Sequence, residues 1–131
     1  PIQVQTRFNV IEKQSFTNQI ISNAKVQESI DVINAAFAPD FVFVFDINNP
    51  DHFVRVTNDD FYVASDEGDG GMKSDLRKGD CSMLNIYANN GGGVLGYATY
   101  PFSCSGDLTD DGVVIKDNTY PGSPDGAPYD G

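Results

Sequence analysis

The chain has 131 residues, of which 40% are hydrophobic and 11% aromatic, so it can bury one ordinary core and we expect a single domain over residues 1–131. Eight basic against nineteen acidic side chains give a net charge of -11, which repels the phosphates of nucleic acids and the headgroups of anionic lipids. Nucleic acid and membrane surfaces are therefore poor partners, and no apolar run reaches the roughly 20 residues that a membrane span needs.

The start of the chain indicates a mature protein. Pro1 stands where an initiator Met would be, and the residues after it alternate between polar and apolar instead of forming the core of a signal peptide. We therefore expect a secreted or vacuolar protein, although a boundary chosen for expression would look the same.

The first predicted element is a half-buried strand over residues 2–10. Its apolar face holds Ile2, Val4, Thr6, Phe8 and Val10, and its polar face holds Gln3, Gln5, Arg7 and Asn9.

The next element is an amphipathic helix between Ser15 and Phe37. Its apolar residues are spaced four, three and four apart, at Val26, Ile30, Ile33 and Phe37. The Ala38-Pro39 pair ends the run, so we expect one long helix with a single buried stripe.

Strands follow the helix. The run FVFVF at 41–45 is continuously apolar, which predicts a strand covered on both faces or placed at the centre of a sheet. The stretch HFVRVT at 52–57 is interpreted as its ragged continuation.

The second half of the chain reads as a loop, a short helix and three strands. The loop is 65–71, the helical turns are 72–79, and the strands lie in 81–88, 93–101 and 112–116. An irregular tail rich in Pro, Gly and Tyr takes up 117–131. Helix and strands alternate early and strands dominate later, which predicts a mixed α/β or α+β fold.

The two cysteines are placed symmetrically about the turn at 89–93. Cys81 and Cys104 have the same sum of positions as Asn90 and Leu95, so they lie at the same end of the two flanking strands, even if another strand intervenes. A disulfide is the favoured interpretation, ahead of two buried thiols. A metal site made from these cysteines and the single His52 lacks a fourth ligand.

Catalytic motifs are scarce. His52 lies in a predicted loop, and no Gly-x-Ser-x-Gly motif or phosphate-binding loop occurs, so we interpret His52 as a solvated loop residue. Carboxylates at Asp107, Asp110 and Asp111 form a weak candidate for calcium, since the distant Glu of an EF-hand is missing and solvated turn residues are the plainer alternative. A second acidic cluster comprises Asp66, Glu67 and Asp69.

Several motifs resemble one family. The stretch LRKGDCSMLNIYANNGGGVLGYATYPFSC at 76–104, then DGVVI at 111–115 and PGS at 121–123, is similar to the secreted fungal metalloproteases of the pappalysin-like metzincin group. The helix sequence ESIDVINAAFAP at 28–39 extends the resemblance over most of the chain.

This resemblance implies a twisted mixed sheet of about five strands with one long backing helix. The strand with Leu95, Gly96, Tyr97 and Ala98 would be the antiparallel edge that holds an extended peptide. The family's cysteines in this strand and in its DGC motif are replaced here by Ala98 and Val113.

The resemblance also implies a zinc helix, His-Glu-x-x-His-x-x-Gly-x-x-His, after a tail like residues 117–131. The 131 residues do not contain this motif, so we expect no catalytic zinc and no enzymatic activity from the chain.

A sheet without that helix would expose an apolar strip, which a ligand, the tail or a second copy must cover. We therefore expect a non-catalytic, secreted homodimer that holds an aromatic or pigment-like molecule where the zinc helix would lie. The expected contact residues are Tyr97, Tyr100, Phe102, Met72, Tyr120 and Tyr129. For Phe102 and Met72, plain packing is the favoured alternative.

Two other functions compete with this expectation. The chain is either the amino-terminal fragment of an active zinc metalloendopeptidase, or a peptide-binding or inhibitory module that uses the exposed edge strand.

Overall fold

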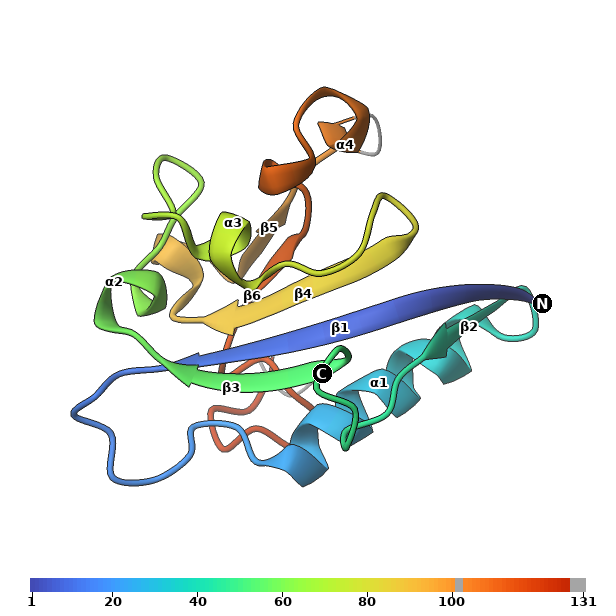
Figure 1. Ribbon diagram of the computed structural model, residues 1–131. Helices are drawn as coiled ribbons and strands as arrows, with labels where there is room; N and C mark the ends of the chain where they lie inside the picture. Colours follow the sequence, from blue (N-terminus) through green and yellow to red (C-terminus); the bar gives the residue numbers. More distant parts are fainter. Residues whose placement is uncertain (101–102, 128–131) are drawn as a thin grey trace.

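The computed structural model describes residues 1–100 and 103–127. A six-stranded sheet with the order β2-β1-β4-β6-β5 forms its centre, and β3 also pairs with β1 (Figure 1). All pairings are parallel except that of β5 with β6. The elements are β1 Ile2–Glu12, α1 Asn23–Phe37, β2 Phe41–Val44, β3 Phe53–Thr57, α2 Asp59–Tyr62, α3 Met72–Leu76, β4 Met83–Asn89, the 3-10 turn η1 Gly91–Gly93, β5 Gly96–Ala98, α4 Ser103–Gly106, the 3-10 turn η2 Leu108–Asp110 and β6 Val113–Lys116.

The predicted fold class is confirmed: a mixed sheet is backed by one long helix, α1. Across the described ranges, no helix combines the length and apolar character needed to cross a bilayer. The part of the tail that the structure describes, residues 117–127, consists of turns.

Strand β1 is the centre of the sheet. It pairs with β2 and then β3 along one edge and with β4 along the other. The alternation of its side chains is as predicted, but the half-buried interpretation is wrong, because Arg7 and Asn9 on the polar face are 3% and 0% exposed. Arg7 donates to the carbonyls of Leu76, Pro50 and Asp51, so its burial is compensated by hydrogen bonds.

Strand β2 lies at an edge, and the prediction that it is covered on both faces or central is wrong. Phe41 and Val42 are more than one third exposed. Strand β3 pairs with the later half of β1, on the same edge as β2, so the interpretation of 52–57 as a ragged continuation is confirmed.

Helix α1 begins at Asn23, because the Ser22 side chain caps it by accepting from the Lys25 N–H. Val26 and Ile30 are buried against β1 and β4, whereas Phe37 at the end of the predicted stripe is half exposed. The stripe is therefore buried at its start and open at its end.

The sheet has a core cluster on each face. Phe8, Ile86 and their neighbours pack against α1 on the first face. Ile11, Tyr87, Val114 and Met72 pack together on the second face, which α2 and α3 cover (Figure 1). Alternate residues of each strand belong to opposite faces, as expected for extended chains.

Candidate functional site

An apolar hollow of about 500 Å³ lies beside α1 on the first face of the sheet. Its lining comes from α1, β1, β2, β4, β6 and the tail: Phe8, Ser29, Ile30, Val32, Ile33, Phe37, Phe43, Leu84, Ile86, Val113, Ile115, Thr119 and Pro121. This is the apolar strip that the sequence predicted.

The hollow exists because one helix is too narrow for this sheet. Five strands span roughly 19 Å at about 4.8 Å spacing, and a helix with side chains is about 10–12 Å wide. Helix α1 packs beside β2 and over β1, so the inward residues of β6 are left without a helix above them. Val32 and Phe37 line the opening and are 45% and 50% exposed.

The predicted ligand contacts are not gathered around this hollow. Met72 is fully buried in the core of the second face, and Tyr97 packs against that same core. Tyr120 packs against the core on the α1 side, and Tyr100 is 71% exposed. Phe102 and Tyr129 lie outside the described residues, and binding of an aromatic molecule stays a prediction.

Strand β5 supplies a different kind of surface. Thr99 N–H donates to Gly112 and Lys116 N–H donates to Leu95, so residues 95, 97 and 99 use their backbone groups to pair with β6. In an antiparallel pair, the residues between them point their N–H and C=O groups the other way. Gly96 and Ala98 are exposed, and their backbone groups face outward from the end of the sheet.

A second, polar hollow of about 290 Å³ lies beside β5 on the second face. Its lining comprises Ser65, Asp66, Glu67, Gly68, Asp69, Lys73, Tyr97, Ala98, Thr99 and Asp110. Burial, followed by the negative charges of Asp69, Asp66 and Asp110, raises the pKa of Tyr97 to about 12.

Lys73 is the one cation among the residues that line this polar hollow, and it is 3% exposed. Its Nζ donates to the Asp110 carbonyl at 2.8 Å and lies 5.6 Å from the centre of the Tyr97 ring. The sequence did not single out this lysine, since residues 72–79 were predicted only as short helical turns. Nothing local in the sequence marks its burial.

The loop that carries Asp66 and Glu67 is held against η1. A side chain at Gly92 would lie 2.7 Å from Ser65 Cα, so only glycine permits this approach, and its φ of 61° also favours glycine. Asn89 fixes the same region by donating to the carbonyls of Phe61 and Ala64.

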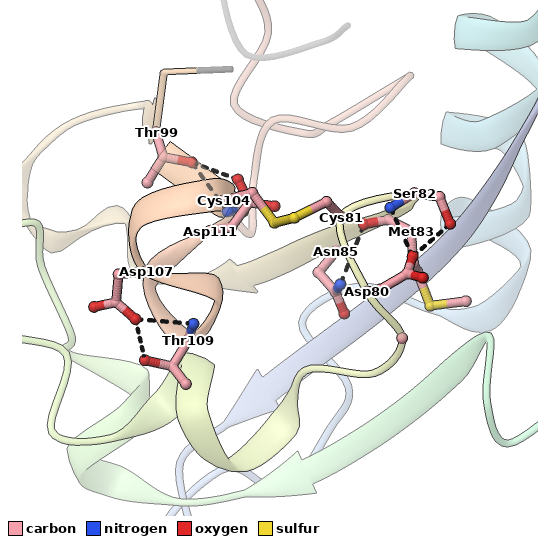
Figure 2. Close-up of a disulfide and its surroundings, with 12 residues drawn as sticks. Asp80, Cys81, Ser82, Met83, Asn85, Thr99, Cys104, Asp107, Thr109 and Asp111 are labelled. Carbon is pink, nitrogen blue, oxygen red and sulfur yellow. Dashed lines mark hydrogen bonds between the residues drawn. A yellow bond between two sulfur atoms is a disulfide. The ribbon is translucent and has the colours of Figure 1, made fainter. Parts of the chain in front are cut away.

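The predicted disulfide is confirmed. Cys81 and Cys104 are bonded with Cα atoms 5.8 Å apart, and they join the turn before β4 to α4 (Figure 2). Strand β6 lies between β4 and β5, so the arrangement with an intervening strand is the correct one.

The three carboxylates proposed for calcium have separate roles. Asp107 caps η2 by accepting from Thr109, and Asp111 accepts from the Thr99 hydroxyl (Figure 2). Asp110 lies 3.9 Å from Lys73. Within residues 1–100 and 103–127, no three His, Cys, Asp or Glu side chains converge as metal ligands would.

His52 is not the solvated residue that the sequence suggested. It is 9% exposed, stacks on Phe45, and accepts a hydrogen bond from the Asp46 N–H through Nδ1. Its role is to close the loop between β2 and β3.

The fold is that of a known class of peptidase. A solved structure of Tannerella forsythia mature mirolysin in complex with a cleaved peptide matches 98% of this chain and 58% of its own, with a TM-score of 0.66 and 23% identity. Mirolysin in complex with a compound matches with the same TM-score and 22% identity. The chain thus has the metzincin-like fold that its motifs predicted.

The relatives by sequence are fungal. Extracellular metalloprotease 1 of Coccidioides posadasii is 34% identical over 135 residues, covering 99% of this chain, and an extracellular metalloprotease of Verticillium alfalfae is 36% identical over 128 residues. No protein-family profile matches the chain. The chain belongs to this fungal extracellular metalloprotease-like family, and it spans 46% and 43% of the length of these two relatives.

The prediction that the protein is non-enzymatic is overturned by this finding, because the relatives that cover the chain are named metalloproteases. The prediction relied on a motif missing from 131 residues that span less than half of those relatives. Its absence there says nothing about the activity of a longer protein.

Proposed function

We propose that this chain forms the peptide-binding part of a secreted metallopeptidase. The observation that carries the proposal is the alignment of 99% of the chain with an extracellular metalloprotease at 34% identity. The outward backbone groups of Gly96 and Ala98 support it, since an exposed strand edge holds an extended peptide by main-chain hydrogen bonds.

Zinc is the metal that the family implies, and the described residues do not fit a zinc site. The Nδ1 atom of His52, the single histidine, already accepts a hydrogen bond from the Asp46 N–H, and the His52 side chain is buried. Structural and catalytic zinc requires three or four His, Cys or carboxylate ligands around one point. In this proposal the ligands belong to a part of the protein outside these 131 residues.

The apolar hollow has a role in the same proposal. It leaves room for one more helix beside α1, and its apolar lining would be buried by the apolar face of such a helix. Thr119 and Pro121 border it, so the tail passes along its rim. A segment of the longer protein would complete the domain there.

The test is made on the secreted protein from its natural source. We expect an intact mass well above the 14.2 kDa of this chain, about one bound zinc per molecule, and protein cleavage that a chelator stops and added zinc restores. A mature protein of about 14.2 kDa without zinc or peptidase activity would refute the proposal.

A small aromatic molecule in the apolar hollow is the second candidate. Its volume of about 500 Å³ lies within the roughly 300–1,000 Å³ of ligand pockets. Phe37, Phe43 and Ile115 would contact such a molecule. Because the chain has no Trp, a bound conjugated molecule would add absorbance above about 300 nm. Denatured, filtered protein should then release that absorbance, and a plain tyrosine spectrum would exclude a bound conjugated molecule.

A further inference from the structure

We propose that the side chain of Asn34 closes the free edge of β2 and so prevents this edge from pairing with a second copy of the chain. Strand β2 lies at the end of the sheet order opposite β5. Closure of this edge does not depend on the proposed function, and failure of either proposal leaves the other unaffected.

The backbone groups of β2 face β1 at every second residue. The Ile2 N–H donates to the Asp40 carbonyl, and the parallel register sets Ile2 beside Phe41. Successive residues of an extended strand direct their N–H and C=O groups to opposite sides. Residues 40, 42 and 44 therefore face β1, and the backbone groups of residues 41, 43 and 45 face outward from the sheet.

Asn34 occupies the middle one of these outward positions. Its Nδ2 donates to the Phe43 carbonyl at 3.1 Å, and its Oδ1 accepts from the Phe43 N–H at 2.7 Å. A side-chain amide has the same donor and acceptor as a peptide group, so Asn34 binds Phe43 as a neighbouring strand would. Helix α1 runs beside β2 and brings this side chain to the edge (Figure 1). An incoming strand cannot pair with Phe43 while Asn34 holds it.

The sequence of β2 itself favours pairing with another strand. An unpaired edge is a template for a further chain, and proteins protect such edges with charged residues, proline or a bulge. The run FVFVF at 41–45 has high β-propensity and contains neither a charged residue nor proline. Phe41 and Val42 are more than one third exposed. The contact from α1 thus supplies a protection that the strand lacks.

A second copy of the chain is the partner that fits the edge once Asn34 is removed. A two-fold axis at Phe43 sets the two strands antiparallel, with Phe43 opposite its own copy and Phe41 opposite Phe45. The outward groups at all three positions then form hydrogen bonds between the copies, and both copies use the same surface. Asp40 and Asp46 oppose each other in this register, so salt that screens their charges should favour the pairing.

The first experiment removes the amide from the 131-residue chain. The variant N34A should have a dimer dissociation constant at least about ten-fold below that of the parent chain. Q27A is the matched control, because it removes from α1 an amide that donates to Asp31, and its dissociation constant should equal that of the parent. Sedimentation velocity at about 0.15 M salt measures all three chains. An unchanged dissociation constant in N34A would overturn the inference.

Amide hydrogen exchange locates the contact, and its first part uses the parent chain alone. Relative to their intrinsic rates, the Phe43 N–H of the parent should exchange at least about ten-fold more slowly than the outward N–H of Phe41, at every protein concentration. In N34A, protection of both amides should increase with protein concentration, as pairing between copies requires. Equal exchange of the two amides in the parent would refute closure of the edge by Asn34. Protection in N34A that does not depend on concentration would refute the second copy as partner.

Discussion

Single residues decide where the polar hollow lies. Gly92 lets the loop at Ser65 approach η1, and Asn89 satisfies backbone carbonyls that the chain turns inward between α2 and that loop. Because a buried carbonyl without a donor costs about 1–3 kcal/mol, Asn89 gives this region one stable arrangement. The acidic side chains of the loop are thereby held beside Tyr97.

Gly92→Ala should destabilise the chain by about 2–3 kcal/mol, since the new methyl group combines a strained φ with a clash against Ser65. Gly93→Ala is the matched control. Its φ is also positive, at 94°, but no atom lies within 4 Å of the added carbon, so we expect a loss of about 1 kcal/mol. Urea unfolding followed by circular dichroism measures both. Equal losses would show that the close approach is unimportant.

Asp117 gives the second prediction at this scale. It is 6% exposed, and its burial raises the pKa of the carboxyl above the ordinary value, although the Tyr62 hydroxyl donates to it at 2.8 Å and acts in the opposite direction. With a raised folded pKa, the stability from this group is present in full below the unfolded value of about 3.8, and it is lost as the pH rises through the folded pKa.

Asp117→Asn should therefore reduce the fall in unfolding free energy as the pH rises from about 4 towards neutrality. The exposed Asp40→Asn is the control and should leave the slope unchanged. Denaturant titrations at several pH values give the two slopes. An identical slope in Asp117→Asn and the parent chain would contradict the prediction.

At the scale of elements, the sequence predicted those helices and strands whose spacing of apolar residues is visible within the element itself. The alternation in β1 and the run in β6 form as expected, whereas the helix predicted between Ser15 and Phe37 covers only Asn23–Phe37 and buries only the first part of its stripe. The position of strand β2 was predicted wrongly, because an apolar run has the same sequence pattern at the edge of a sheet as at its centre. Its place depends on the order of the strands, which the run itself does not determine. The strand predicted over 93–101 is shorter in the part of it that the structure describes, where β5 is Gly96–Ala98, since the glycines at 91–93 form a turn before it.

The candidate sites were harder to predict for the same reason. The apolar strip could be predicted because the resemblance implies a second helix beside α1, and these 131 residues do not contain it. The polar hollow could not be predicted in this way, because it lies between a loop at 65–69 and a strand that begins at Gly96. Neither segment alone indicates that they meet. Burial of Lys73 and His52 likewise depends on distant residues that cover them.

The disulfide stabilises elements that have little core of their own. It closes a loop with a separation of 23 residues, for which the chain-entropy estimate is about 3 kcal/mol. The variant C81A/C104A should lose about that much unfolding free energy in urea, and the reduced parent chain should lose a similar amount. A loss under about 1 kcal/mol in both would show that the folded contacts alone hold α4 in place.

At the scale of the whole molecule, the apolar hollow is an apolar surface that the described residues leave exposed to solvent. Replacing Val32 and Phe37 with Glu should cost little stability, because both side chains are about half exposed, and should sharply reduce the fluorescence of an apolar dye added to the chain. The control I2E/V63E places the same charges on exposed apolar residues outside the hollow. Equal dye binding by both double variants would show that the hollow is not a binding surface.

The central position of β1 affects how the chain emerges from the ribosome. Val10 finds its β4 partner, Ala88, only 78 residues later, which takes roughly 4–16 s at translation rates of about 5–20 residues per second. Its partners on the other side, β2 and β3, emerge earlier, so during that interval β1 has an unpaired edge on its β4 side, as an aggregation-prone segment would. Gln3, Gln5, Arg7 and Asn9 make every second side chain polar, which keeps the nascent strand soluble. In the folded chain, Arg7 and Asn9 are buried and donate hydrogen bonds to backbone carbonyls.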